Sequence, residues 1–424
     1  MLIQFISDSP DTAATPVPGN LGRPGSGDNV RICIDSSGKI HLAYTVNNQL
    51  TYATSSPGQF ILVPTSLGVP RFTQAFEYTL HDNAMPSPWN WDSISLFDLA
   101  VDSQGRAHLA FQGVEQTDHM TLGDVQHAVW DGNQFVSANI LAPGALSVIL
   151  TGIAITIAND DSVHIAYADQ FGLHYATRGA SQTNFQLHDV DTQKGNRFNL
   201  SIAVGSGGTT GISYMFLSPP SQQLSSGVVQ LRYAQKMTAT SWIVDTADQG
   251  PLQQAVLGEI GSNSLAIDAA GIPHIAYCDG AMRIRHGTWT AAGQGFWVVG
   301  PFGNGEIVDP LGSSNPTKIL LDEHGNLYIA YQSSGHNVML ATTLGFPGWG
   351  AVTADASTSS GWSISAAMHP KSGEPHIAYG CPLAIATSGT LQLKHSWGLN
   401  LMLQPPPRPP KKPPINIVKA KLPG

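Results

Sequence analysis

The chain of 424 residues carries 20 Lys and Arg against 29 Asp and Glu, and five of the basic residues lie within the last 21 positions. The acidic body repels nucleic-acid phosphates, which argues against general nucleic-acid binding. Three scattered cysteines without a C-x-x-C pair argue against a disulfide framework or a cysteine metal site. With 44 Gly, 29 Pro and only 12% charged residues, the composition is typical of short strands joined by tight turns.

The ends of the chain and its apolar runs bear on location. No apolar run reaches the length that spans a membrane, and the first ten residues lack the basic flank and apolar length of a signal peptide. The protein is therefore expected to stay in the cytoplasm, to leave the cell by another route, or to be the mature form of an extracellular protein.

Three segments follow one another along the chain. Residues 1–28 form an N-terminal segment that begins with a strand-like run, Met1–Ile6. Residues 29–403 hold a repeat, and residues 404–424 form a basic, proline-rich tail. The tract Pro405–Pro414 favours a polyproline II conformation, so the tail is expected to be a disordered extension or, through its P-x-x-P spacing, a site for a protein partner.

The repeat is recognised by one phrase, whose clearest copy is Asp268-Ala-Ala-Gly-Ile-Pro-His274-Ile-Ala-Tyr277. A degenerate copy ends in Gly211-Ile-Ser-Tyr214. Units of about fifty residues fit the blades of a β-propeller and are too long for most solenoid repeats. The closing tetrads of the seven copies begin at residues 41, 108, 164, 211, 274, 328 and 376.

Each unit predicts four strands. An apolar run forms the first, an Asp-x-x-Gly turn leads into the His-Ile-Ala-Tyr strand, and a third strand has the pattern Leu-x-Tyr-Ala. An aromatic residue begins the fourth strand, at Phe60, Phe135, Phe185, Trp242, Trp297 and Trp349. The sequence therefore predicts an all-β, seven-bladed β-propeller of four-stranded antiparallel blades.

The outer strand of the seventh blade has two candidates. Leu399–Gln404 could supply it in sequence order, or Met1–Ile6 could cross from the N-terminus. The N-terminal strand is preferred, because it adds hydrogen bonds between the chain ends and leaves no blade edge open.

The phrase Asp-x-x-Gly-x-Pro-His-Ile-Ala-Tyr, followed by Leu-x-Tyr-Ala and an aromatic residue, resembles the repeats of sialidase-like (BNR-type) propellers over residues 29–397. The resemblance implies the propeller fold and a lectin-like member of a superfamily that also includes sialidases and polysaccharide lyases. The sialidase motif Ser-x-Asp-x-Gly-x-x-Trp is absent, and so is the Gly-His and Trp-Asp signature of WD40 blades.

The repeated histidines resemble a metal or acid–base array at first sight. Because each occupies the same place in a different blade, they cannot converge on one ion, and packing with turn hydrogen bonds is the favoured interpretation. They are His41, His108, His164, His274 and His376.

Ligand-binding residues are expected in the segments that do not repeat. The longest insertion lies between the first two blades and combines Trp89, Trp91 and Asp92 with His81 and Asp82. Indole rings stack on the C–H face of a sugar while carboxylates bind its hydroxyls, so these residues predict a sugar site. The alternative is that they only pack the loop onto the ring.

A second group consists of Arg232 and Tyr233 on one blade and Arg285 and His286 on the next. The two arginines hold equivalent places in neighbouring third strands and could bind an anionic sugar, while His286 and Tyr233 could act as base and acid in the β-elimination of a uronic acid. Surface ion pairing is the alternative.

Carbohydrate binding through aromatic and polar loops or pockets between blades is the function expected from the sequence. A polysaccharide lyase or glycoside hydrolase and a protein-interaction platform are the alternatives. A glycan is the expected partner. No motif indicates a cofactor or a metal ion.

Overall fold

The hairpin turns of the repeat form as their residue types predict. In the copy at Asp268, the carboxylate accepts hydrogen bonds from the backbone N–H groups of Ala270 and Ile272. Gly271 has φ of +80°, the left-handed conformation that favours glycine. The turn joins β20 (Asn263–Ile267) to β21 (Pro273–Cys278) as an antiparallel hairpin.

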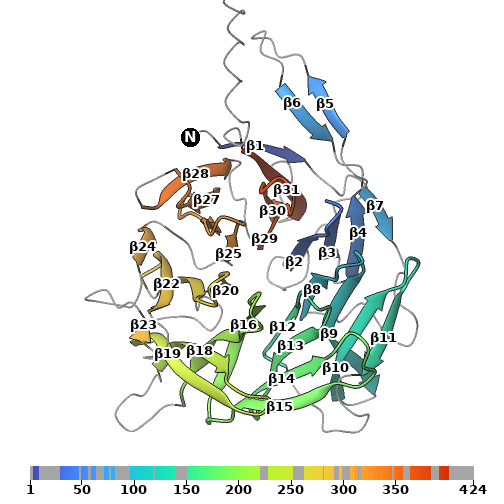
Figure 1. The fold of residues 1–424 in the computed structure, drawn as a ribbon, viewed down its shortest axis with the longest axis vertical. Helices are drawn as coiled ribbons and strands as arrows, with labels where there is room; N and C mark the ends of the chain where they lie inside the picture. Colours follow the sequence, from blue (N-terminus) through green and yellow to red (C-terminus); the bar gives the residue numbers. More distant parts are fainter. Residues whose placement is uncertain are drawn as a thin grey trace, which may run out of the picture.

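A computed structural model shows the seven repeats as seven blades around one axis (Figure 1), which confirms the predicted fold class. No helix is present in the part of the chain that the structure describes, so none there could cross a membrane. The described residues are 3–8, 29–46, 49–55, 59–63, 71–75, 78–81, 96–117, 120–139, 150–219, 228–251, 262–279, 281–290, 296–297, 306–310, 312, 317–345, 348–356, 363–382 and 391–400.

Blades 1 to 4 follow the chain from the innermost strand outward. Blade 1 consists of β2 (Val30–Ile34), β3 (Ile40–Val46), β4 (Gln49–Ser55) and β7 (Tyr78–His81). Blade 2 consists of β8 (Phe97–Val101), β9 (Ala107–Thr117), β10 (Met120–Trp130) and β11 (Phe135–Asn139). Blade 3 consists of β12 (Gly152–Ile157), β13 (Val163–Ala168), β14 (Leu173–Arg178) and β15 (Gln186–Asp191). Blade 4 consists of β16 (Asn196–Val204), β17 (Thr210–Leu217), β18 (Val228–Lys236) and β19 (Trp242–Pro251).

Blades 5 to 7 complete the ring. Blade 5 adds β22 (Ile284–Thr290) to β20 and β21, and both β23 (Phe296–Trp297) and β24 (Glu306–Asp309) pair with β22. Blade 6 consists of β25 (Lys318–Leu321), β26 (Leu327–Gln332), β27 (Val338–Thr342) and β28 (Gly350–Asp355). Blade 7 consists of β29 (Ile364–Met368), β30 (Pro375–Pro382), β31 (Leu391–Asn400) and β1 (Ile3–Asp8).

The outer strand of blade 7 therefore comes from the N-terminus. Strand β1 pairs antiparallel with β31 along six residue pairs, from Ile3 opposite Asn400 to Asp8 opposite His395. Of the two sequence candidates, the N-terminal run holds this place, and Leu399 and Asn400 belong to the third strand instead.

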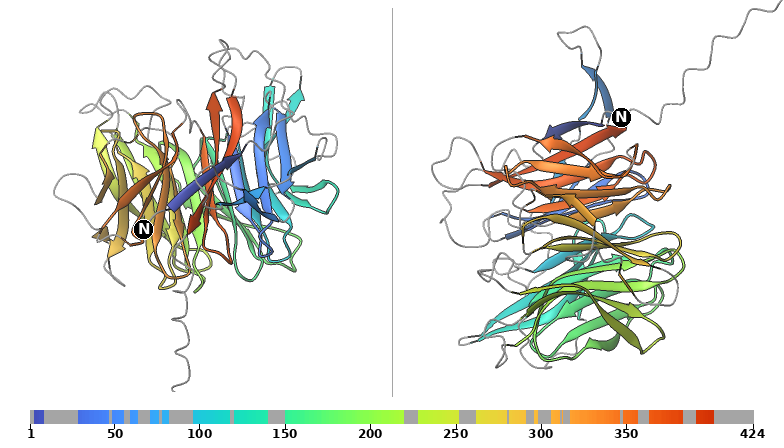
Figure 2. Two further views of the ribbon diagram at one scale, coloured as in Figure 1. Left: turned by 90° about the horizontal axis from the view of Figure 1, so that it is seen from above. Right: turned by 90° about the vertical axis from the view of Figure 1, so that its left-hand side faces the viewer.

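One strand prediction is wrong. Phe60 does not begin the fourth strand of blade 1 but lies in β5 (Gln59–Val63), which pairs only with β6 (Arg71–Ala75). This hairpin projects beyond the ring when the molecule is viewed from the side (Figure 2). An aromatic start occurs twice in this repeat, and the later one, Tyr78, begins the strand that pairs with β4.

The apolar core is divided among the seven seams between neighbouring blades. One buried cluster joins Tyr52 of blade 1 to Leu109 and Trp130 of blade 2, and another joins Leu42 of blade 1 to Ala378 of blade 7. Each blade thus buries both faces, and the aromatic starts of the fourth strands contribute. Trp242 of blade 4 packs edge-on against Tyr175 of blade 3, with ring centroids 5.0 Å apart.

Polar groups also join the blades near the axis. The Oγ of Ser363 accepts a hydrogen bond from the backbone N–H of Val30 at 3.0 Å, and Ser264 accepts one from Ile319 at 3.2 Å. These hydroxyls stand on the innermost strand of one blade and bind the innermost strand of the next. Backbone donors that face a neighbouring blade are thereby satisfied.

At the outer part of the seams, the tyrosine that closes the tetrad donates a hydrogen bond to an aspartate of the preceding blade. The aspartate lies in the outermost strand, just after a β-bulge that shifts the register of that strand by one residue. Phe111, which has no hydroxyl, takes the tyrosine's place in blade 2. The pairs are Tyr214–Asp191, Tyr277–Asp248, Tyr331–Asp309 and Tyr379–Asp355, at 2.6 to 2.8 Å.

We expect the substitution Tyr277→Phe to destabilise the ring by about 1–3 kcal/mol, because it leaves the buried carboxylate of Asp248 without its hydroxyl donor. The phenyl ring itself fits, as Phe111 shows. Urea unfolding measures the loss, and a double-mutant cycle with Asp248→Ala isolates the pair. Additive effects of the two substitutions would show that the bond does not couple the blades.

Candidate functional site

The repeated histidines are structural, as the repeat suggests. His41 donates from Nε2 to the turn carboxylate of Asp35, and its Nδ1 accepts from the hydroxyl of Tyr52 at 2.7 Å. In blade 5, the Nδ1 of His274 lies 3.0 Å from the Nε2 of His286. Both ring nitrogens are therefore occupied within one blade, between the turn and the third strand.

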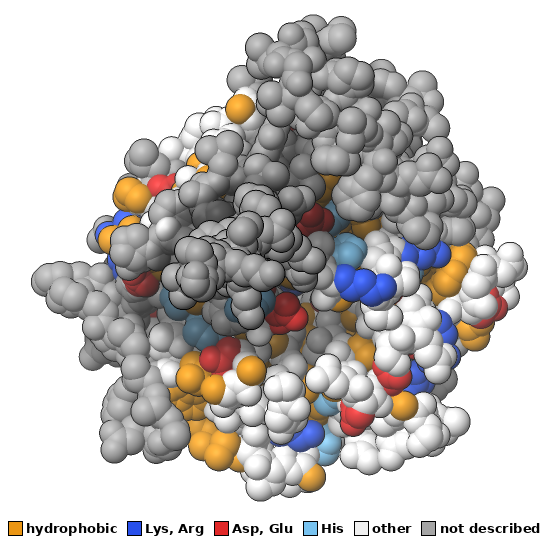
Figure 3. Space-filling model, turned by 45° about the horizontal axis from the view of Figure 1, so that its top comes forward, with side chains coloured by type: hydrophobic (Ala, Val, Ile, Leu, Met, Phe, Trp, Pro, Cys, Tyr) orange, Lys and Arg blue, Asp and Glu red, His pale blue; other side chains and the backbone are white. Residues whose placement is uncertain are grey.

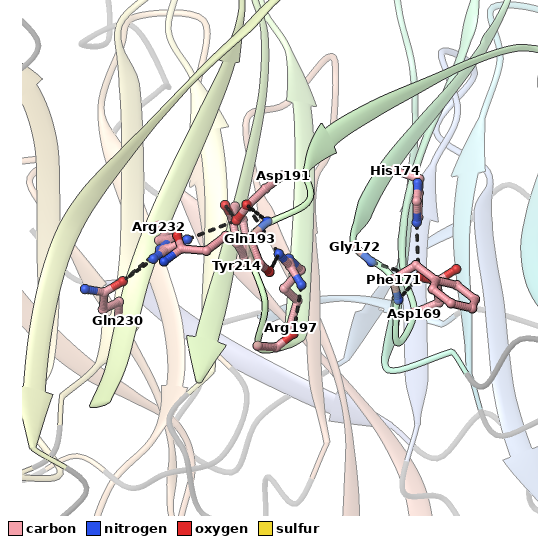
Figure 4. A network of polar contacts seen from close by, with 11 residues as sticks. Asp169, Phe171, Gly172, His174, Asp191, Gln193, Arg197, Tyr214, Gln230 and Arg232 are labelled. Atoms are coloured by element: carbon pink, nitrogen blue, oxygen red, sulfur yellow. Dashed lines mark hydrogen bonds and ion pairs between the residues drawn. The ribbon is translucent and has the colours of Figure 1, made fainter. Parts of the chain in front are cut away.

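Arg232 and Arg285 do hold equivalent places, opposite Tyr214 and Tyr277, the tyrosines that bind an aspartate of the preceding blade. Each is buried and neutralised. Arg232 donates to Asp191 at 3.0 Å and to Gln230, and its guanidinium lies 3.6 Å from the centroid of the Phe216 ring. Figure 4 shows this network, in which Asp191 also accepts a hydrogen bond from the hydroxyl of Tyr214 and forms an ion pair with Arg197.

Arg285 pairs with Asp279 of its own blade, so the two guanidinium groups serve different carboxylates. His174 holds the same place in blade 3, between Asp169 and Asp189 (Figure 4). Burial disfavours its charge, but the hydrogen bonds to the two carboxylates outweigh burial and raise its pKa.

Tyr233 and His286 follow these arginines directly in their strands, so their side chains point to the opposite face of each sheet. Tyr233 is fully buried and packs edge-on against Trp289, and His286 packs against Trp349. The structure thus does not bring the proposed acid and base together with the arginines.

Burial and the neighbouring His274 lower the pKa of His286 to about 3. The unfolded chain takes up a proton near pH 6.5 and the folded chain does not, so stability is lost as the pH falls below 6.5. One such histidine removes about 2 kcal/mol between pH 7 and pH 5. We expect His286→Tyr, which copies the His–Tyr pair of blade 1, to lessen the fall in thermal midpoint over this range. Equal pH slopes for the variant and the parent protein would contradict it.

The sugar site predicted from the longest insertion lies outside the described residues, with one exception. His81 ends β7, in the fourth strand of blade 1, and only its backbone is described. Trp89, Trp91, Asp92 and Asp82 lie outside the described residues, so this site stays a prediction.

In two adjacent blades, small residues replace the aspartate of the repeat's turn. In blade 3, Ala158 occupies the position that the turn aspartate holds in other blades. The turn still closes through the hydrogen bond from Asp161 N–H to the carbonyl of Ala158. In blade 4, Gly205 replaces the aspartate and Gly211 the histidine. A side chain at Gly211 would lie 2.5 Å from the hydroxyl of Tyr233, which fills the missing histidine's place.

A cavity of about 510 Å³ opens at this seam, between the turns of blades 3 and 4. We call it the seam cavity. Hydroxyl, carboxylate, imidazole and ammonium groups face it from four turns or strand ends. Its polar side chains are Asn159, Asp160, Ser162, His164, Ser206, Thr210, Lys236 and Thr238.

One wall of the seam cavity is a chain of hydrogen bonds in blade 3. Asp160 accepts hydrogen bonds from the hydroxyl of Ser162 at 2.5 Å and from the backbone N–H of Ser162, and both bonds lower the pKa of Asp160. The Oγ of Ser162 in turn accepts from His164 Nε2 at 2.7 Å, and His164 Nδ1 accepts from the hydroxyl of Tyr175. Burial and the nearby Lys236 lower the pKa of His164 to about 4. His164 is therefore neutral at physiological pH.

A second, smaller cavity of about 220 Å³ lies on the axis, lined by the innermost strands of all seven blades. Its charged side chains are Arg31, Asp98 and Lys318, and Arg31 is bound to Asp98 at 2.8 Å. Within the described ranges, no group of three or more His, Cys, Asp or Glu side chains could hold a metal ion. On the face in Figure 3, blue basic side chains lie in separate groups among acidic and histidine side chains.

No protein-family model and no curated protein matches this chain. Among solved structures, the BP39L lectin from Burkholderia pseudomallei aligns over 87% of this chain and 96% of its own, with a TM-score of 0.53 and 11% identity. A protein of unknown function from Dyadobacter fermentans covers 72% of this chain and 94% of its own, with a TM-score of 0.48 and 10% identity. An ulvan lyase aligns over 87% of this chain and 93% of its own, with a TM-score of 0.47 and 13% identity. At such identities the likeness is one of fold alone.

Sequence reasoning missed the seam cavity, because the strongest copies of the repeat drew attention to the conforming positions. The signal is nevertheless present in the sequence, since two consecutive copies lack the turn aspartate and the second also lacks the histidine. Where a site forms because side chains are missing, the copies that depart from the repeat's pattern indicate its position.

Proposed function

We propose that the protein is a carbohydrate-binding propeller of the lectin type and that the seam cavity is a sugar-binding site. The observation that carries this proposal is the polar cavity of about 510 Å³ where two adjacent blades lose their turn side chains. Its volume lies within the range of small-molecule sites, roughly 300–1,000 Å³.

The lining suits a polyol. Asp160 and Ser162 from blade 3 and Thr210 from blade 4 offer donors and acceptors, and sugar hydroxyls can use both kinds. The groups stand on strand ends or turns fixed by backbone hydrogen bonds, such as Gly208 N–H to the carbonyl of Gly205. Little ordering entropy then opposes binding. The shared fold with a Burkholderia lectin adds support at the level of scaffold.

The finer assignment to the sialidase-like superfamily is part of this proposal. It is supported by the Asp-x-x-Gly turn and the His-Ile-Ala-Tyr strand that follows it in blades such as the fifth. The absence of the sialidase Asp-box is consistent with a binding member.

We expect Ser206→Trp to abolish glycan binding at the seam cavity without unfolding the ring. Ser206 is exposed on a turn at the cavity edge, so an indole there blocks the entrance and meets no core residue. Ala269→Trp is the matched control, because Ala269 is exposed at the equivalent place of blade 5. A glycan array run on the parent protein and both variants measures the effect. Binding that survives in Ser206→Trp would place the sugar elsewhere.

The predicted loop site is tested independently. If Trp89 and Trp91 stack on a sugar, replacing both with alanine is expected to weaken glycan binding by about tenfold or more, because two stacking surfaces are lost. Titration calorimetry with the best glycan of the array measures the change. Unchanged affinity would show that these residues only pack their loop.

Two further roles stay predictions from the sequence. One is a lyase or hydrolase that uses Arg232, Arg285, His286 and Tyr233. The other is a platform for another protein, recruited through the tail at residues 404–424. Neither gains support from the described contacts, since the four residues lie in separate structural pairs and the tail lies outside the described residues.

A further inference from the structure

Lys236 differs from Arg197, Arg232 and Arg285, which each face a carboxylate. It ends β18, lines the seam cavity and holds its ammonium 4.8 Å from the centroid of the Tyr175 ring in blade 3. Burial lowers the pKa of Lys236. Within the part of the chain that the structure describes, no carboxylate forms an ion pair with it.

The buried arginines show how this chain normally treats a cation. Arg232 and Arg197 face Asp191, and Arg285 pairs with Asp279. A buried charge without a partner is costly, so such pairing is the rule in protein interiors. Lys236 is half-buried beside a cavity, where the missing partner can come from outside.

The neighbouring seam gives the matched comparison. Arg178 ends the third strand of blade 3 as Lys236 ends that of blade 4, and its guanidinium lies 4.8 Å from the centroid of the Phe185 ring. At that seam the turn of blade 2 keeps its carboxylate, Asp102, which is bound to His108 at 3.2 Å. At the seam of Lys236, the corresponding position is Ala158, so no turn carboxylate binds His164 there, and the exposed Asp160 of the same turn binds Ser162 instead.

We infer that the seam cavity binds a sugar carrying a carboxylate, which pairs with Lys236. This inference rests on the proposed carbohydrate function and narrows its ligand to an acidic sugar. The ring hydroxyls of the sugar then face Ser162, Thr210 and Thr238. Asp160 also lines the cavity, but its carboxylate is exposed to solvent and bound by Ser162, so water screens its repulsion.

The experiment is calorimetric titration of the full chain with oligosaccharides of glucuronic and galacturonic acid and with their carboxyl-reduced counterparts. The acidic forms are expected to bind about tenfold or more tightly, as a charge-assisted hydrogen bond predicts. Lys236→Met, which keeps the stem and removes the charge, is expected to erase this preference, whereas Lys236→Arg keeps it. Ala158→Asp supplies the carboxylate from the chain and is expected to abolish binding of the acidic sugar.

Arg178→Met is the matched control, since it removes the equivalent cation at a seam whose aspartate is present. It is expected to leave the affinity unchanged, and thermal midpoints confirm that every variant folds. Equal affinity for acidic and carboxyl-reduced sugars, or a preference that survives in Lys236→Met, would overturn the inference and leave the carbohydrate function standing. A sulfated neutral oligosaccharide that binds as tightly as the uronic acids would overturn the choice of carboxylate. Binding of none of these or the arrayed glycans would refute the proposed function itself.

Discussion

Every blade of this ring has to bury both faces against its neighbours, and the polar groups on those faces must find partners in the seam. The bonds from tyrosine hydroxyls to aspartates of the preceding blade meet this requirement in four seams. Without them, a buried carboxylate such as Asp248 would lack its hydroxyl donor. The free-energy cost of that loss exceeds the gain from one additional apolar contact. The hydroxyls of the innermost strands meet the same requirement for backbone N–H groups near the axis.

The same constraint explains why a cavity arises where the repeat deviates. In a conforming blade, the turn aspartate and the histidine satisfy each other and fill the outer part of the seam, as Asp35 and His41 do. Blade 3 lacks the aspartate, and Ser162 takes over as the acceptor for His164. The hydrogen bond of His164 is preserved, although no side chain fills the volume of the missing aspartate. Loss of side chains in two neighbouring copies therefore produces space without a buried unsatisfied group at His164.

Charge separates structural positions from the candidate site. Arg197, Arg232 and Arg285 are buried and each faces a carboxylate, which leaves them no capacity for an anionic ligand. Lys236 is half-buried at the edge of a cavity, and its ammonium lies over the face of the Tyr175 ring.

The sequence by itself determined the architecture. The spacing of the tetrads set the number of blades, and the Asp-x-x-Gly phrase set the hairpin, since both depend on local backbone chemistry and residue order. It also determined that the histidines are structural, because equivalent places in different blades cannot converge. Only the tertiary structure decided which strand of the first repeat reaches β4, since aromatic residues at both Phe60 and Tyr78 offered a start. It likewise decided that Arg232 and Tyr233 face opposite ways in β18, and that Lys236 lines a cavity between two blades. These facts depend on which residues of neighbouring blades meet across a seam, and no repeat read along one chain contains that information.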